Sequence, residues 1–307
     1  MHKRKAKNHS PLAHSDARFQ YRFLSQLKAT LTRSAAINDS TAPVVVSFSS
    51  RGANDISKDI LKPDISAPGV DILAAFSPVA SISKVHGDTR SVKYSILSGT
   101  SMACPHATGA AAYVKSFHPK WSPAAIKSAL MTTASPMNGN TTVFAYGAGH
   151  INPIKAVDPG LVYATQQGDY IKMLCSEGYN STTLRLITGH KTTCPTSSTA
   201  TKDLNYPSMT LSVKANSWIT ANFTRTVTNV VPMNSKYKVT FNPNSSLNIT
   251  VSPSVLSFKS LGEKRTFIVT VEGAVKKGGP SGRLSATSIV WSDGAHNVRS
   301  PIVVYAS

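Results

Sequence analysis

A serine that leaves a short strand and opens an alanine-rich helix is the residue of this sequence best suited to chemistry. Ser98-Gly-Thr-Ser forms the turn between a strand predicted at Tyr94–Leu97 and a helix predicted from Ser101 to about His118. A serine on such a turn exposes its hydroxyl, and its own N–H points to where an oxyanion would form. Gly99 lets a substrate backbone come close. A nucleophile would be well placed on this turn, but the turn alone is a weak signal, since any buried helix can begin with Gly-Thr-Ser.

The elements around this turn alternate between strand and helix. An apolar, β-branched run at Val44–Ser50 is predicted to be a buried strand, and a turn at Pro68-Gly69 leads into a second short buried strand. The helix from Ser101 is expected to be buried as well, and another helix is predicted to begin at Pro123 after the N-cap Ser122. Strands that alternate with helices indicate an α/β layer.

From about Asp203 the hydrophobic pattern changes to a period of two. Segments at 222–228, 236–241, 265–271, 285–291 and 300–305 alternate apolar and polar side chains, with turn residues between them. About seven short strands over roughly 100 residues predict an antiparallel sandwich. We therefore expect a basic segment at 1–40 that fits no pattern, an α/β domain at 41–165, a connector at 166–202 and a sandwich at 203–307.

The composition indicates a folded protein and argues against several kinds of partner. The apolar content is 41% and the charged content 15%, and no apolar run approaches the length that spans a bilayer. The net charge of +19 is scattered, without interleaved stacking aromatics, and only Lys3–Lys7 form a basic cluster of the kind that is usually a solvated tail. We therefore expect neither nucleic-acid nor membrane binding, but a non-specific attraction to acidic polysaccharide or anionic surfaces.

The full string around the serine, Ser98-Gly-Thr-Ser-Met-Ala-Cys-Pro-His-Ala-Thr-Gly, resembles the nucleophile signature of the subtilase family of serine peptidases. Further strings are similar to the plant, cucumisin-like branch of that family, from about Thr41 to the last residue. The resemblance implies the C-terminal portion of a plant subtilisin-like serine protease, with part of a parallel-sheet α/β domain followed by an all-β fibronectin type III-like sandwich. The further strings are Val46-Ser-Phe-Ser-Ser-Arg-Gly, Ile60-Leu-Lys-Pro-Asp-Ile-Ser-Ala-Pro-Gly-Val-Asp, Tyr146-Gly-Ala-Gly-His-Ile-Asn-Pro, Pro159-Gly-Leu-Val-Tyr and Asp203-Leu-Asn-Tyr-Pro-Ser.

The resemblance also assigns roles around the turn. It implies that Ser101 is the acylating nucleophile of a serine endopeptidase and that the Ser101 N–H is half of the oxyanion hole. Gly99 and Thr100 would then lie next to the substrate, and Cys104 and Pro105 would pack the start of the helix. The family acts on peptides or proteins, and the resemblance implies no cofactor and no metal.

The activating aspartate and histidine of the family are not encoded in this sequence. Their usual strings, Asp-Ser/Thr-Gly and His-Gly-Thr-His, are absent, and His86-Gly-Asp comes closest, only 15 residues before Ser101. His106 lies about 140° around the helix from Ser101, and both His106 and His150 are expected to be structural. A serine hydroxyl without a base is a poor nucleophile near neutral pH. We therefore expect a truncated chain that is inactive alone.

Cysteines and glycosylation sequons fit a secreted protein. Cys175 and Cys194 are expected to form a disulfide if the protein is secreted, with two free thiols as the alternative, and three cysteines are too few and too spread for a zinc site. The family resemblance implies an extracellular location, in the apoplast or cell wall, although no signal peptide is visible. The basic charge adds an association with acidic cell-wall polymers as one option. Asn-X-Ser/Thr sequons begin at Asn8, Asn38, Asn140, Asn180, Asn222, Asn244 and Asn248.

The sequence leaves two classes of function open. In the first, the chain is part of a serine endopeptidase that works through Ser101. In the alternative, it is a non-catalytic fragment that binds a protein or a polyanion, because the predicted sandwich is intact and the chain is basic. Reaction of Ser101 with a fluorophosphonate would favour the first class, and silence would favour the second.

Overall fold

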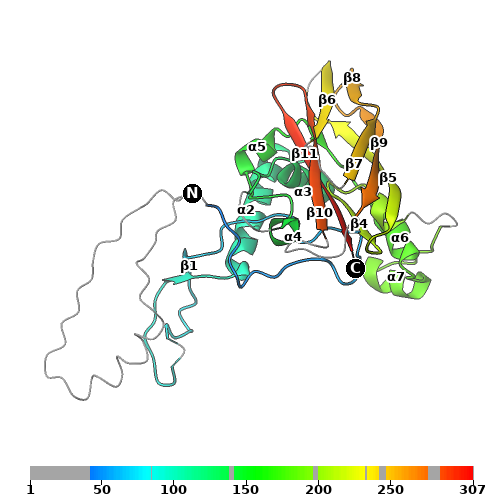
Figure 1. Cartoon of the computed structure of the whole chain (residues 1–307). Helices are drawn as coiled ribbons and strands as arrows, with labels where there is room; N and C mark the ends of the chain where they lie inside the picture. The colour runs from blue at the N-terminus through cyan, green and yellow to red at the C-terminus, as the bar shows by residue number, and fades with distance from the viewer. Residues whose placement is uncertain are drawn as a thin grey trace. The chain divides into compact units, whose positions relative to one another are not determined.

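The computed structural model describes residues 42–83, 85–137, 142–195, 200–231, 234–241, 247–275 and 284–306. Val45–Met137 and Thr141–Ser307 group into one compact unit (Figure 1). The segment 1–40 with its cluster Lys3–Lys7 lies outside the described residues, as do the sequon residues Asn8, Asn38, Asn140 and Asn244. No described helix is both long and apolar enough to cross a membrane.

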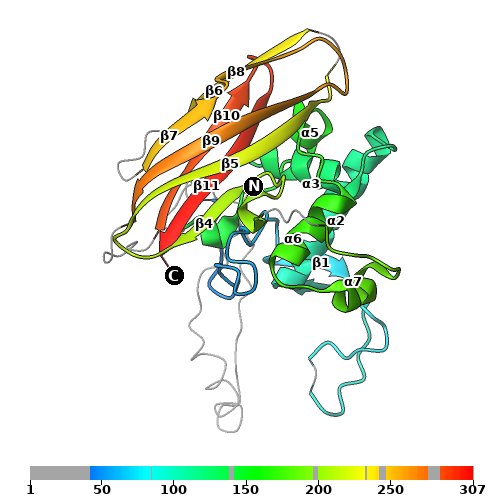
Figure 2. The ribbon, with the colours of Figure 1, turned by 90° about the vertical axis from the view of Figure 1, so that its right-hand side faces the viewer.

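Two sheets form a β-sandwich in the C-terminal part of the chain (Figure 2), which confirms the predicted sandwich. One sheet has the strand order β3-β5-β9-β7 and the other the order β4-β11-β10-β6-β8. Strand β4 runs parallel to β11, with Met209 opposite Ile302, and the other described pairs of the sandwich are antiparallel. The bounds are β3 Leu161–Val162, β4 Met209–Val213, β5 Trp218–Asn229, β6 Ser235–Phe241, β7 Leu247–Ser252, β8 Val255–Phe258, β9 Lys264–Ala274, β10 Leu284–Ser292 and β11 Asn297–Ala306.

The period-two pattern along these strands builds the core of the sandwich. Strand β5 turns Phe223, Arg225 and Val227 inward, while the residues between them face outward. In the core, Trp291 meets Phe267 edge to face at 5.0 Å between ring centroids. Aromatic pairs in this geometry add about 0.5–1.5 kcal/mol to the stabilisation from buried area.

The residues from 45 to 157, which we call the serine segment, hold one pair of strands and four helices in their described part. Strand β1 (Ile72–Ala75) pairs with β2 (Tyr94–Leu97), and both helices predicted from the sequence are present. Ser122 caps the second of them by accepting a hydrogen bond from Ala125 N at 3.2 Å, as its place before Pro123 predicts. The helices are α2 (Thr100–Phe117), α3 (Pro123–Thr132), α4 (Val143–Tyr146) and α5 (Pro153–Val157).

Three predictions for the serine segment are wrong, and all concern burial. The strand that follows Pro68-Gly69, β1, contains no buried residue, and its Leu73 side chain is 68% exposed. Residues 44–50 form no strand, and the Phe48 side chain is 53% exposed. Helix α2 is not a buried helix, since Ala110 and Val114 are its buried residues. The strands β1 and β2 pair antiparallel, and no parallel sheet occurs among the described residues of this segment. An apolar run becomes a buried strand only where a neighbouring strand offers hydrogen bonds and a second layer covers it, and the described residues supply neither at 44–50.

The serine segment and the sandwich share packed contacts. Helix α3 lies against β11, and Leu61, Val143 and Val303 form one apolar cluster. Arg299 of β11 donates hydrogen bonds to the carbonyl oxygens of Ala148 and Ala134. The chain between the two regions contains helices α6 (Gln167–Ser176) and α7 (Ser181–Thr188) and the short helix η1 (Thr201–Asp203). The β4–β11 side of the five-stranded sheet is therefore the side that faces the serine segment.

Candidate functional site

The chain that leads into β1 forms hydrogen bonds with the turn between β2 and α2. Gly99 N donates to Gly69 O at 2.8 Å, and Met102 N donates to Gly99 O at 3.0 Å. The Ser98 hydroxyl accepts from Asp71 N at 2.8 Å and donates to the Asp71 carboxylate at 3.2 Å. These bonds fix the start of α2, and so they fix the position of Ser101.

Two glycines near the serine differ in what surrounds them. A Cβ atom at Gly69 would lie 2.9 Å from Gly99 O, so the backbone of the turn itself requires glycine there. A Cβ at Gly99 would meet nothing closer than 3.6 Å, and Gly99 has an extended backbone that any residue can adopt. The described residues therefore do not explain glycine at position 99, and the space beside it is open to another molecule.

Ser101 lies at the second position of α2, and its side chain is exposed. The first N–H groups of a helix have no partner within the helix, so the N–H groups at this end, that of Ser101 included, are available to an incoming oxygen. Within the described part of the chain, no hydrogen bond reaches the Ser101 hydroxyl. The site thus presents a hydroxyl that could act as a nucleophile and an N–H donor, and no described residue is hydrogen-bonded to that hydroxyl so as to take its proton.

Three of the four described histidines of the serine segment contact backbone groups away from Ser101, and the fourth is exposed in a loop. His106 Nδ1 lies 2.7 Å from Met102 O within α2, and His118 Nε2 lies 2.6 Å from Val157 O. His150 forms backbone bridges with Ser66 and Ser135. Burial lowers the pKa of His150, which keeps its ring neutral at physiological pH. His86 is exposed in the loop between β1 and β2.

The strands and the helix on either side of the turn expose large apolar side chains. Leu73 and Ile96 are direct cross-strand partners, so their side chains lie on one face of the β1–β2 pair, and they are 68% and 63% exposed. Tyr113 and Phe117 are exposed on α2. Cys104 is a free, exposed thiol and Pro105 is also exposed, so neither packs the start of the helix as the family resemblance implied.

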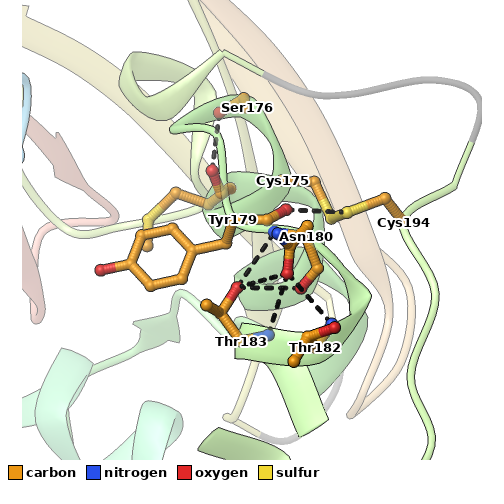
Figure 3. The surroundings of a disulfide bond; sticks show 8 residues. Cys175, Ser176, Tyr179, Asn180, Thr182, Thr183 and Cys194 are labelled. Atoms are coloured by element: carbon orange, nitrogen blue, oxygen red, sulfur yellow. Dashed lines mark hydrogen bonds between the residues drawn. A yellow bond between two sulfur atoms is a disulfide. The ribbon is translucent and has the colours of Figure 1, made fainter. Parts of the chain in front are cut away.

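A disulfide closes the region between the serine segment and the sandwich (Figure 3). It joins Cys175 near the end of α6 to Cys194 beyond α7, with the Cα atoms 5.7 Å apart. Asn180 is the N-cap of α7, and its side-chain oxygen accepts from Thr182 N and Thr183 N at 3.0 Å each. The bridge and the cap therefore tie two short helices that bury few side chains of their own.

Three of the sequon asparagines fall on described, exposed positions. Asn180 lies at the start of α7, Asn222 on β5 and Asn248 on β7. The register places Asn222 opposite Thr270 and Asn248 opposite Glu272, so both lie near β9 on the outer face of the four-stranded sheet. Among the described residues, no group of three histidine, cysteine or carboxylate side chains is arranged to hold a metal.

Sequence reasoning missed the polar residues that join distant segments. His296, in the turn between β10 and β11, lies 3.1 Å from the Asp158 carboxylate and 2.8 Å from that of Asp293. Arg225 is buried in β5 and donates to four carbonyl oxygens, those of Lys202, Tyr206, Ser208 and Thr224. The only sequence signal was a charged residue at an inward position of an alternating strand, which predicts a buried partner but does not identify it.

Known proteins resemble this chain over most of its length. Residues 19–149 match the subtilase family, and residues 203–304 match a fibronectin type-III domain. The Subtilisin-like protease SBT4.9 of Arabidopsis thaliana is 54% identical over 285 residues, which cover 90% of this chain and 39% of that protein. For Subtilisin-like protease SBT4.10 of the same plant the identity is 54% over 287 residues, covering 91% of this chain and 41% of that protein. The chain thus spans about two-fifths of the length of these relatives.

Proposed function

Because this chain belongs to the subtilase family and carries a fibronectin type-III domain after its subtilase residues, we propose that it is part of a serine endopeptidase with Ser101 as the nucleophile. The observation that carries the proposal is the position of Ser101: an exposed hydroxyl at the start of α2, on a turn fixed by Gly69 and Asp71. Its substrates would be peptides or proteins.

In the proposed reaction the Ser101 oxygen attacks the carbonyl carbon of a peptide bond. The C–O bond forms as the hydroxyl proton passes to a base, and the Ser101 N–H stabilises the oxyanion. The C–N bond then breaks as the same base returns the proton to the leaving amine, and water releases the acyl group by the same steps in reverse order. Open space at Gly99 would admit the substrate backbone beside Thr100.

The base is the part that the described residues do not supply. His106, His118 and His150 are held by backbone groups, and the sequence contains neither family string for the activating aspartate or histidine. We therefore propose that the 307-residue chain is inactive alone and that the base comes from residues outside this sequence. The size of the effect is known from subtilisin, another member of this family, in which loss of the serine or histidine lowers turnover by about 10⁶-fold.

Chemical rescue tests whether Ser101 is the nucleophile. The purified chain is treated with a fluorophosphonate at increasing concentrations of imidazole, which supplies the missing base from solution, and the modified peptide is identified by mass spectrometry. The expected label lies on Ser101, is faint without imidazole and increases with it. The Ser116→Ala variant, which changes another exposed serine of α2, should label like the parent chain. A label on another residue, or equal labelling of Ser101→Ala, would remove the proposal.

Several further features support the domain division and an extracellular setting. We propose an α/β part at 41–165, a connector at 166–202 and a fibronectin type III-like part at 203–307, with 1–40 as a separate segment, although the subtilase match already begins at residue 19.

The Cys175–Cys194 disulfide and the exposed sequons at Asn180, Asn222 and Asn248 support secretion, because disulfides persist in oxidising compartments. Asn140 and Asn244 are proposed as glycosylation sites from their sequons alone.

A non-catalytic binding role is the second candidate. It is favoured by the sandwich, whose apolar core includes no residue of the serine segment, and by the excess of basic residues in the chain. The two candidates separate in the rescue experiment, since a binding fragment gives no imidazole-dependent label at Ser101.

A further inference from the structure

One end of the five-stranded sheet carries a concentration of positive charge. Strands β6 and β8 form the side of this sheet opposite to β4 and β11, which face the serine segment (Figure 2). Lys236 and Lys238 alternate with buried residues along β6 and are both exposed. In the register of β6 and β8, Lys236 lies opposite Ser257 and Lys238 opposite Val255. The two lysines therefore stand on one face, about 7 Å apart along the strand.

The turn from β8 to β9, which connects the two sheets, carries further cations at this edge of the sandwich, with Lys264 on the outer face of the four-stranded sheet. Arg265 Nε donates to Ser257 O at 3.0 Å, so its side chain reaches the residue that lies opposite Lys236. Lys259 follows β8 and Lys264 opens β9, and both are exposed. We call Lys236, Lys238, Lys259, Lys264 and Arg265 the basic edge.

The two carboxylates near the basic edge, Glu263 and Asp293, already have partners. Glu263 pairs with Arg265 and accepts from the backbone N–H groups of Lys259 and Ser260. The bond from Lys259 N is the main cause that holds the pKa of Glu263 below its usual value, although burial acts the other way. Asp293, on the neighbouring strand end, is turned toward His296. Among the described residues, none of the four lysines of the basic edge forms an ion pair, although the charge of Lys259 also acts on Glu263.

We propose that the basic edge is a docking surface for a carboxylate-rich polysaccharide. Lysine ammonium groups are strongly hydrated point charges that suit separate carboxylates along a polymer, and each exposed pair contributes little, so binding requires several in succession. The one arginine, which would favour phosphate through its planar fork, is already engaged by Glu263 and Ser257 O.

Other polyanions fit this surface less well. Single-stranded nucleic acid binds through successive bases stacked on exposed aromatic rings, whereas Tyr237 and Phe258 beside these lysines are buried in the core and Phe241, at the end of β6, is the one exposed aromatic residue of these two strands. Binding to an anionic membrane grows with the apolar area inserted, and Leu261 is the exposed large apolar residue of this turn. The proposal does not depend on Ser101, and docking at this end leaves the serine segment uncovered.

The test uses the full chain at concentrations where it is monodisperse and measures its affinity for polygalacturonate over a range of salt. The variant Lys236→Gln, Lys238→Gln, Lys259→Gln, Lys264→Gln should bind about tenfold more weakly at low salt and show a smaller salt dependence. A control variant with the same net charge replaces four exposed lysines elsewhere with glutamine, namely Lys93, Lys120, Lys155 and Lys191. It should change affinity by less than about twofold, and the double variant Lys236→Gln, Lys238→Gln should fall between.

Three results would overturn the proposal. Equal losses in the two fourfold variants would mean that diffuse charge, not the basic edge, binds the polymer. Equal binding of fully methyl-esterified polygalacturonate would mean that carboxylates are not recognised. Tighter binding of single-stranded DNA or of phosphatidylserine vesicles than of polygalacturonate would assign the surface to another class of partner. Matching circular dichroism spectra and melting temperatures of all variants exclude misfolding as the cause.

Discussion

His296 Nε2 lies 3.1 Å from the Asp158 carboxylate, so a side chain of the β10–β11 turn contacts the residue that ends α5. The other ring nitrogen lies 2.8 Å from Asp293, whose carboxylate also accepts the His296 backbone N–H. Gly160 packs on the same ring, where a Cβ atom would come within 2.8 Å of His296 and 2.6 Å of the Tyr237 hydroxyl. This contact links residues 138 positions apart, and it includes a group that titrates near neutral pH.

The His296 contact predicts a pH-dependent stability. Burial lowers the pKa of His296, but the hydrogen bonds to Asp293 and Asp158 outweigh burial and raise it overall. Since the folded state holds the proton more tightly, the contribution is complete below the unfolded pKa of about 6.5 and is lost as pH rises through the folded pKa. Asp158→Asn should lower the free energy of unfolding by about 0.5 kcal/mol at pH 5, because Asp158 is 70% exposed, and by almost nothing at pH 9.

Denaturant titrations at both pH values measure this difference. Tyr237, the other titratable group facing His296, stays neutral across the range because burial raises its pKa. The exposed His86 is the control, since His86→Gln should leave the pH profile unchanged. An equal effect of Asp158→Asn at pH 5 and pH 9 would show that the pair does not act through the charged imidazole.

The disulfide between Cys175 and Cys194 predicts a loss of stability on reduction. It closes a loop of 19 residues in sequence separation, for which loop-closure entropy gives about 3 kcal/mol. We expect the variant Cys175→Ser, Cys194→Ser to lower the free energy of unfolding by that order, measured without reductant. Cys104→Ser, which changes the free thiol, should have little effect. Peptide mapping that found both thiols free in oxidised, secreted material would contradict the bridge.

The buried guanidinium of Arg225 predicts a large effect on stability, because it binds the chain from the end of the connector to the start of β4. It donates to Lys202, Tyr206 and Ser208 carbonyls, which belong to or follow η1, so it holds that segment against β5. Arg225→Met keeps the volume but leaves buried carbonyl groups without donors, so we expect a loss of about 3 kcal/mol in the free energy of unfolding. The exposed Arg265 is the matched control, and Arg265→Met should cost less than about 0.5 kcal/mol. A similar small loss for both variants would show that the connector does not depend on Arg225.

The open face of the serine segment predicts self-association. Leu73 and Ile96 are cross-strand neighbours that are both more than half exposed, and apolar surface of this kind drives association. We expect the chain to associate with rising concentration and the variant Leu73→Thr, Ile96→Thr to weaken association at least about tenfold in analytical ultracentrifugation. The variant Leu261→Thr, Ile268→Thr removes exposed apolar groups from the sandwich instead and should change little. A parent chain that stays monomeric at high concentration would contradict the prediction.

The sandwich was predictable because five of its strands, β5, β6, β9, β10 and β11, carry their own local signal. In β5 the alternation that buries Phe223 and Val227 is visible in the sequence, and turn residues mark both ends. Which strands pair was not predictable, because the parallel pairing of β4 with β11 joins segments about 90 residues apart. The contacts of Arg225 and His296 depend on that pairing and were missed for the same reason.

Burial in the serine segment could not be predicted from hydrophobicity. The run at 44–50 and the helix from Thr100 are rich in apolar residues, yet Phe48 and Phe117 are exposed. An apolar segment can be buried, but it is buried only where other residues supply a second surface to cover it. The turn at Ser101 was predictable as a turn because the strand before it and the helix after it carry local signals, whereas its hydrogen bonds to Asp71, 27 residues before Ser98, were not.

Peptide hydrolysis by the purified 307-residue chain tests the account most directly. We predict turnover of a fluorogenic peptide library no greater than that of the Ser101→Ala variant, because no described residue accepts the Ser101 proton. Hydrolysis by the parent chain that disappears in Ser101→Ala and persists in Ser116→Ala would contradict this account, since it would require a base among the residues already present.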